Sequence, residues 1–206
     1  MREDLILLVT SLFAGIICMI FHELPKVLIY RRYVQKNSMK ELMITTYGKV
    51  NPIHFIDPIG LLFCIMFRIG FSKPSYYRMK EKNLNQKLGF VGLISLLTQF
   101  LIVVSVLRFG YGMNAKLILS ANVSLPFEFF MYFLVCYAII SIGMFITNLF
   151  PLLSTDMAWI LTSQNPMKFI VLLKSDFLIK MVWILLVILG VTPGICLKIF
   201  EVFMGV

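Results

Sequence analysis

The sequence predicts an all-α polytopic protein of the cell membrane, built as a single membrane domain over residues 1–206. Of the 206 residues, 60% are hydrophobic and only 14% are charged, and the mean hydropathy is +0.91. A chain of this composition has too few polar side chains to cover a water-soluble surface. Its long charge-free runs are typical of helices that cross a lipid bilayer.

About five apolar segments are predicted to be transmembrane helices, since a helix of about 20 apolar residues crosses the hydrocarbon core. They comprise residues 5–30, 57–72, 88–108, 128–150 and 177–197.

The first segment contains Pro25, which removes a backbone donor and clashes with the carbonyl group of Phe21. A kink or a helix break is therefore expected beside His22 and Glu23. An ionisable pair at membrane depth is costly, so this pair marks a candidate functional site.

The stretch that follows the first segment is basic. Within it, residues 43–47 have the β-branched and aromatic content of a short strand, so an interfacial β-ribbon or a loop is expected. A second basic stretch follows segment 57–72, which is short and contains Arg68. Because the two basic stretches flank one short segment, either this segment does not cross fully or one stretch is external.

The net charge of +9 invites a nucleic-acid interpretation. However, most of the basic residues stand beside apolar runs, where anionic lipid headgroups are their natural partners. The predicted partner is therefore the lipid bilayer, with no nucleic acid.

The last two segments both contain helix-breaking residues. Pro151 follows segment 128–150, so a non-helical turn is expected to lead to Asp156 near membrane depth. In the final segment, Gly190 and Pro193 predict a kink or an early end.

The pair His22-Glu23 opens the motif His-Glu-x-x-His, in which two histidines one helical turn apart bind zinc and the glutamate acts as general base. In this chain the fifth position of the motif is Lys26. The motif is therefore half complete.

Four sequence blocks, in this order, resemble those of the site-2 protease family, the polytopic zinc metalloproteases that cut transmembrane segments inside the bilayer. The blocks are His22-Glu23, Asn51-Pro52-Ile53-His54-Phe55-Ile56-Asp57-Pro58-Ile59-Gly60, Gly70-Phe71-Ser72-Lys73-Pro74, and Asn148-Leu149-Phe150-Pro151 followed by Asp156. The resemblance implies a site-2 protease-like core, with Asp57, Pro58, Asn148 and Pro151 as family framework residues.

By the same resemblance, His22 is the first zinc ligand, Asp156 is the third, and Glu23 is the base that activates metal-bound water. The second histidine is replaced by Lys26, and Pro25 is foreign to a motif that the family forms as a regular helix. Further departures are Leu96 in place of the family's asparagine, and Met157 and Ala158 in place of the two glycines after the aspartate.

Lys26 is a poor substitute for a zinc ligand. An ammonium group about 5 Å from a divalent ion is repelled by roughly 6 to 7 kcal/mol at an effective dielectric constant near 20. Glu23 lies three residues before Lys26, and helical spacing lets the two side chains pair.

Each site residue therefore has two interpretations. His22 is either a metal ligand or a buried polar residue satisfied by other partners, and Glu23 is either the base or the partner of Lys26. Asp156 is either a ligand or the N-cap of a following helix. His54 is the candidate for a replacement zinc ligand.

The favoured function is a catalytically impaired or inactive relative of these proteases that binds a transmembrane segment or peptide and needs no cofactor. The alternative is an active, divergent zinc metalloprotease that uses His22, Asp156 and either His54 or a neutral Lys26. A second alternative is a small transporter component with a polar path lined by Glu23, Lys26 and Arg68.

Overall fold

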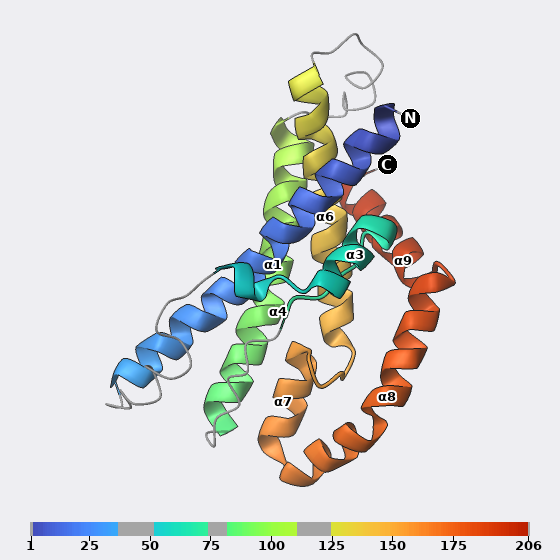
Figure 1. The fold of residues 1–206 in the computed structure, drawn as a ribbon. Coiled ribbons are helices and arrows are strands. Elements are labelled where there is room, and N and C mark those ends of the chain that lie inside the picture. The colour runs from blue at the N-terminus through green and yellow to red at the C-terminus, as the bar shows by residue number, and fades with distance from the viewer. Residues whose placement is uncertain (1, 37–51, 74–81, 111–124, 206) are drawn as a thin grey trace.

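The computed structural model describes residues 2–36, 52–73, 82–110 and 125–205, and within these ranges the chain is all-α (Figure 1). The α-helices are α1 (Arg2–Lys36), α3 (Pro58–Phe67), α4 (Lys82–Ser105), α6 (Leu125–Leu149), α7 (Asp156–Gln164), α8 (Pro166–Ile188) and α9 (Val191–Met204). A 3-10 helix, η1 (Pro52–Phe55), precedes α3, and a π-helix, η2 (Val106–Gly110), follows α4. The β-ribbon or loop expected at residues 43–47 lies outside the described residues.

Three of these helices, α1, α4 and α6, are long and apolar enough to cross a membrane. A fourth candidate is the pair α8 and α9, which is bent by 61° at its break. The described part of the chain therefore has three or four candidate crossings, rather than the predicted five.

The predicted segment that does not reach spanning length is 57–72. Its helix, α3, has 10 residues, a length of about 15 Å, whereas the hydrocarbon core is about 30 Å thick.

α1 continues through Pro25 as one helix, so of the predicted kink or helix break, the break is wrong and the kink stays a prediction. A proline is tolerated inside a membrane helix where other groups satisfy the freed backbone. Ser95 of α4 donates a hydrogen bond of 3.5 Å from Oγ to the carbonyl oxygen of His22, one residue after the Phe21 carbonyl group that loses its donor at Pro25.

Strong capping signals set the bounds of α3. Asp57 caps its N-terminus, where Oδ1 accepts hydrogen bonds of 2.9 Å from the backbone N–H groups of Ile59 and Gly60. Its C-cap is Arg68, which adopts the left-handed conformation at φ 55°. The sharp turn at Arg68 sends the chain back along α3.

We expect Asp57→Ala to lower the free energy of unfolding by about 1 kcal/mol, because two backbone donors of α3 lose their acceptor. Denaturation in detergent micelles measures this loss. Asp57→Asn keeps the acceptor oxygen and is expected to retain most of the stability. Equal losses in the two variants would contradict the capping role.

The predicted turn after segment 128–150 is confirmed, because α6 ends at Leu149 and α7 begins at Asp156. The N-cap of α7 is Thr155, so the interpretation of Asp156 as the N-cap is wrong. The predicted early end of the last segment is confirmed as well. α8 ends at Ile188, and Gly190 adopts a φ of 75° before α9.

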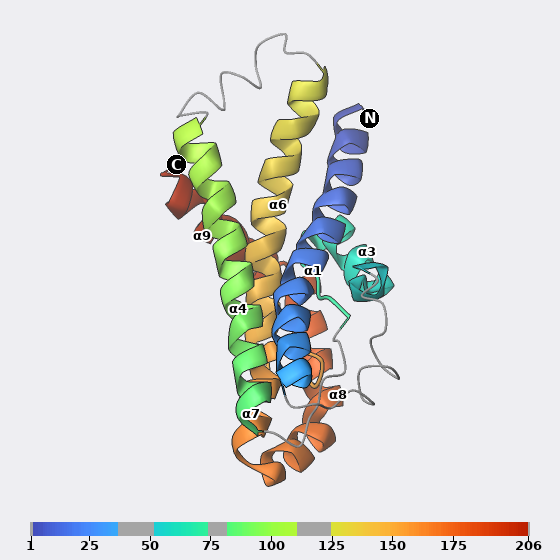
Figure 2. The ribbon, with the colours of Figure 1, turned by 90° about the vertical axis from the view of Figure 1, so that its left-hand side faces the viewer.

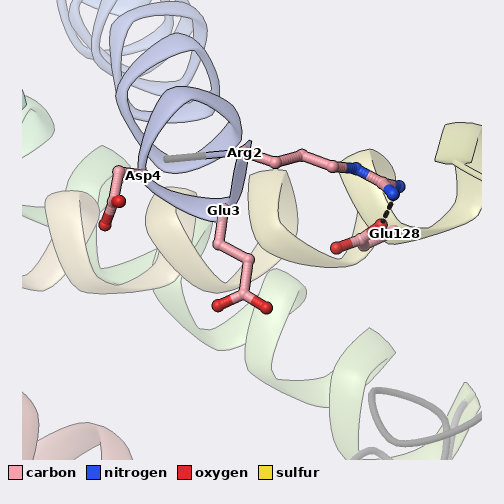
Figure 3. A pocket seen from close by; sticks show the side chains of 4 residues that line it. All are labelled: Arg2, Glu3, Asp4 and Glu128. Atoms are coloured by element: carbon pink, nitrogen blue, oxygen red, sulfur yellow. Dashed lines mark hydrogen bonds and ion pairs between the residues drawn. The ribbon is translucent and has the colours of Figure 1, made fainter.

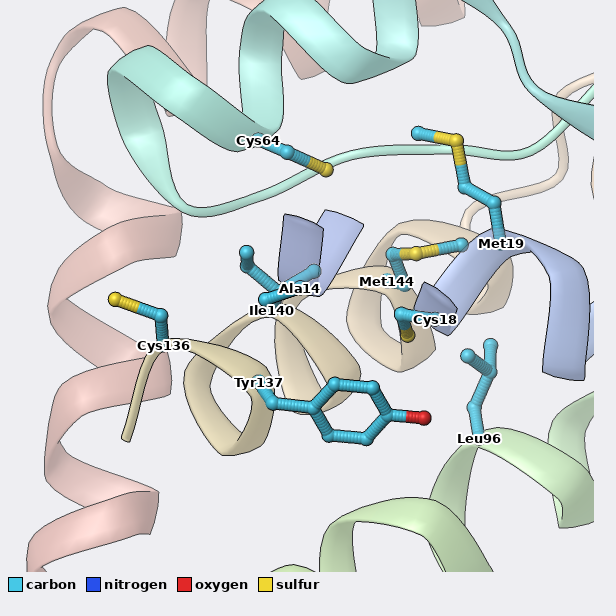
Figure 4. Packing of buried hydrophobic residues seen from close by; sticks show 9 residues of the cluster. All are labelled: Ala14, Cys18, Met19, Cys64, Leu96, Cys136, Tyr137, Ile140 and Met144. Carbon is cyan, nitrogen blue, oxygen red and sulfur yellow. The ribbon is translucent and has the colours of Figure 1, made fainter. Parts of the chain in front are cut away.

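The core lies where α1, α4 and α6 pack against one another, as the two views of the bundle show (Figures 1 and 2). One buried cluster joins four helices (Figure 4): Ala14, Cys18 and Met19 of α1, Cys64 of α3, Leu96 of α4, and Cys136, Tyr137, Ile140 and Met144 of α6. Several of its members are small, which lets helices in a membrane approach closely. This packing holds the middle of α1 beside α4 and α6.

Candidate functional site

The site is a buried polar cluster of five side chains: His22, Glu23 and Lys26 from α1, Ser72 from the segment after α3, and Asp156 from the first turn of α7. None of the five residues is more than 6% exposed. The structure therefore brings together His22 and Glu23 of the first block, Lys26, and the aspartate of the fourth block.

Lys26 connects the two carboxylates of the cluster. Its Nζ donates to Glu23 Oε1 at 2.6 Å and to Asp156 Oδ1 at 3.0 Å. The pairing of Lys26 with Glu23 expected from their helical spacing is thus present, and Asp156 adds a second pairing across the bundle.

His22 completes the cluster. Its Nε2 lies 2.7 Å from Asp156 Oδ2, and its Nδ1 lies 2.8 Å from Ser72 Oγ. The Ser72 hydroxyl also donates a hydrogen bond of 2.7 Å to Glu23 Oε1. Lys26 lies between the carboxylates of Glu23 and Asp156, and the His22 ring contacts Asp156 and Ser72. Buried charges are stable when they are paired and hydrogen-bonded in this way.

Asp156 reaches the cluster because two glycines of α4 leave room for it. A Cβ at Gly92 would overlap the Asp156 carboxylate, and a Cβ at Gly89 would lie 2.7 Å from the Asp156 carbonyl oxygen. Asn148 of α6 supports the same residue, since its Oδ1 accepts a hydrogen bond of 3.3 Å from the backbone N–H of Asp156.

Ser72 is the site residue that sequence reasoning missed. The segment that contains it packs tightly on α3, because a Cβ at Gly60 would overlap the carbonyl group of Phe71. The Phe71 ring also contacts Trp183 of α8 edge-on, with ring centroids 5.8 Å apart. The sequence feature that could have indicated Ser72 as a site residue is its position as the one hydroxyl residue of the third block, directly before Lys73.

The cluster does not fit a zinc ion. Two ligands at about 2.0 to 2.1 Å in tetrahedral geometry would lie about 3.3 Å apart, whereas His22 Nε2 and Asp156 Oδ2 are in direct hydrogen-bond contact at 2.7 Å. The second carboxylate oxygen of Asp156 binds the Lys26 ammonium group. His54, the proposed replacement ligand, lies exposed in η1. Among the described residues, no group of three or more His, Cys, Asp or Glu side chains is arranged to hold a metal ion.

Ser72, His22 and Asp156 are hydrogen-bonded in the order of a Ser-His-Asp triad. A triad requires the serine hydroxyl to donate to a free ring nitrogen, whereas the Ser72 hydroxyl donates to Glu23. The geometry is thus that of a closed hydrogen-bond network.

A separate surface pocket of about 310 Å³ lies at the N-terminus of α1 and is lined by Arg2, Glu3, Asp4 and Glu128 (Figure 3). Arg2 is 65% exposed and pairs with Glu128 at 3.0 Å. Such an exposed ion pair contributes little to stability. The pocket lies about 18 residues along α1 from His22, roughly 27 Å at 1.5 Å per residue.

Comparisons of this chain with family models, with curated proteins and with solved structures found no match.

Proposed function

We propose that this chain is a site-2 protease-like integral membrane protein that does not carry out zinc-dependent proteolysis and that binds a transmembrane segment or peptide. In this proposal α1, α4, α6 and α7 form the protease-like core. The observation that carries it is the position of Lys26 Nζ, 2.6 Å from Glu23 and 3.0 Å from Asp156. The ammonium group is thus hydrogen-bonded both to Glu23, the expected base, and to Asp156, an expected metal ligand.

The arrangement of the four sequence blocks supports the family part of the proposal. Residues of three blocks meet in the buried polar cluster: His22 and Glu23 from the first, Ser72 from the third, and Asp156 from the fourth. A chance match of short motifs gives no reason for them to meet in space.

The energetic argument concerns Lys26. A zinc ion bound to His22 and Asp156 would have to separate the ammonium group from Asp156 and then hold it about 5 Å away. At an effective dielectric constant near 20, the repulsion is roughly 6 to 7 kcal/mol, which weakens zinc binding by more than about four orders of magnitude.

Metal analysis of the purified protein tests this part. We expect far less than one zinc per chain in the unchanged protein, whereas Lys26→His, which completes the motif, raises the zinc content and Lys26→His/Asp156→Ala abolishes the gain. Glu23→Gln is expected to leave any processing of a co-expressed single-span protein unchanged. One zinc per chain, lost on His22→Ala, together with cleavage that requires Glu23, would overturn the proposal in favour of an active zinc protease.

Binding of a transmembrane segment or peptide rests on the family resemblance. A photoreactive residue at Phe21, which is 52% exposed and adjacent to His22, is expected to cross-link to a co-expressed single-span segment. Phe109 is 82% exposed in η2 at the far end of α4 and serves as the control position. Equal cross-linking at the two positions would contradict a binding site beside the cluster.

A further inference from the structure

The two ends of the helix bundle differ in charge. At one end α1 finishes, α4 begins and α8 begins, and the exposed cations there are Arg32, Lys73, Lys87 and Lys168. We call this the basic end. The opposite end has the start of α1, the start of α6 and the C-terminal part of α9. There the cations Arg2, Arg108 and Lys198 are offset by the acidic residues Glu3, Asp4, Glu128 and Glu201.

Packing contacts define both ends. At the basic end, Val27 and Tyr30 of α1 are buried against Leu84 and Leu88 of α4 and against Phe55 of η1.

At the opposite end, Leu107, which follows α4, packs against Met131 of α6 and Met204 of α9. Arg108 donates a hydrogen bond of 2.9 Å to the carbonyl oxygen of Phe203. The two termini of the described chain therefore both lie at the end of the bundle opposite the basic end, as Figure 1 shows.

The chain enters and leaves the α3 region at the basic end. The residue before this region, Phe55, and the residue after it, Lys73, are joined by a backbone hydrogen bond of 3.0 Å from the Lys73 N–H group to the Phe55 carbonyl oxygen. Phe55 itself belongs to the packing cluster of the basic end. With only 10 residues, α3 goes into the bundle and the chain returns to the side from which it came.

This arrangement resolves the orientation problem that the sequence poses. A segment that crossed the membrane would separate the two most basic stretches of the chain, but a segment that returns leaves them on one side. The first stretch contains Arg31, Arg32, Lys36, Lys40 and Lys49, and the second contains Lys73, Arg78, Lys80, Lys82 and Lys87.

We propose that α3 is re-entrant and that the basic end faces the cytoplasm, where its cations bind the anionic phospholipid headgroups of the inner leaflet. Cytoplasmic connections are enriched in Lys and Arg, and anionic lipids attract such juxtamembrane clusters. The four crossings are α1, α4, α6 and the pair α8 and α9, so residues 2 and 205 both lie on the non-cytoplasmic side. This inference does not depend on the proposed function.

Cysteine labelling tests the orientation. The native cysteines, Cys18, Cys64, Cys136 and Cys196, are all buried, so the unchanged protein supplies a low background. Exposed reporter positions are Glu3→Cys and Glu201→Cys at one end, and Arg32→Cys, Lys73→Cys and Lys168→Cys at the basic end.

With a membrane-impermeant maleimide, we expect the first two variants to react in intact cells and the other three to react only after the membrane is opened. Arg32→Cys and Lys73→Cys form the decisive pair, since they flank the α3 region. Reaction of these two from opposite sides would show that the region crosses the membrane. Reaction of the basic-end positions in intact cells would show the inverse orientation, and either result would overturn the proposal.

Lipid retention tests the headgroup contact. The purified protein is expected to retain phosphatidylglycerol over phosphatidylcholine from a mixed micelle, and Arg32→Gln/Lys87→Gln/Lys168→Gln is expected to lose this preference. Lys198→Gln, an exposed position on α9, is the control and should keep it. No preference in the unchanged protein, or an equal preference in the triple variant, would overturn the lipid contact.

Discussion

Lys26→Met is expected to lower the free energy of unfolding by about 3 to 5 kcal/mol, the cost of removing one partner from a buried ion pair. Methionine has a similar length, so the packing of α1 is largely kept. The carboxylates of Glu23 and Asp156, both within 3.0 Å of the ammonium nitrogen, would remain buried without their common partner. Titration of the protein in mild micelles with a denaturing detergent measures the change.

Two comparisons separate the charge effect from shape. Lys180→Met removes a lysine whose side chain is 48% exposed and which pairs with the buried Asp176 of α8. Asp176 keeps a hydrogen bond from the Leu153 N–H group, so the loss is expected to be smaller than that of Lys26→Met. Glu23→Gln/Lys26→Met/Asp156→Asn removes the buried carboxylates as well, so we expect it to be more stable than Lys26→Met alone. A Lys26→Met protein as stable as the unchanged one would contradict the bridging role.

Gly92→Ala is expected to cost about 3 kcal/mol, at the upper end of the range for overpacking a buried site. The added methyl group would overlap the Asp156 carboxylate, which is held by both His22 and Lys26. Relief of this overlap requires α4 and α7 to separate, so a single methyl group disturbs the whole buried polar cluster. The same denaturing titration reports the loss.

Gly194→Ala provides a matched control on α9. A Cβ at Gly194 meets no atom within 4 Å, and alanine is favoured over glycine inside a helix by roughly 0.5 to 1 kcal/mol. The two glycine substitutions are therefore expected to change stability in opposite directions. A loss of similar size in both would show that the Gly92 effect does not come from contact with Asp156.

The long helices could be predicted from the sequence because they depend on local composition. The charge-free runs around Leu96 and Tyr137 lie in α4 and α6, and the turn before Asp156 follows from Pro151. Local composition does not show whether segment 57–72 crosses the membrane. The reversal of the chain after α3 depends on the left-handed turn at Arg68 and on the hydrogen bond between Lys73 and Phe55, and both form only in the folded chain.

The candidate site was only partly accessible to sequence reasoning. The pairing of Glu23 with Lys26 follows from helical spacing and is present. The contact of Lys26 with Asp156 joins residues 130 positions apart, and no periodicity within either helix predicts it. Ser72 was missed for the same reason, since its partners His22 and Glu23 lie about 50 residues earlier in the chain.

The pairing of Glu23 with Lys26 within one helix also bears on biosynthesis. Asp156 follows Lys26 by 130 residues, so at 5 to 20 residues per second a ribosome needs on the order of 10 s to produce it. During that interval the newly made α1 must leave the translocon without its cross-bundle partner. A cation three residues after the carboxylate lets the nascent helix neutralise itself, and a helix with an isolated carboxylate at this depth would partition into lipid less readily.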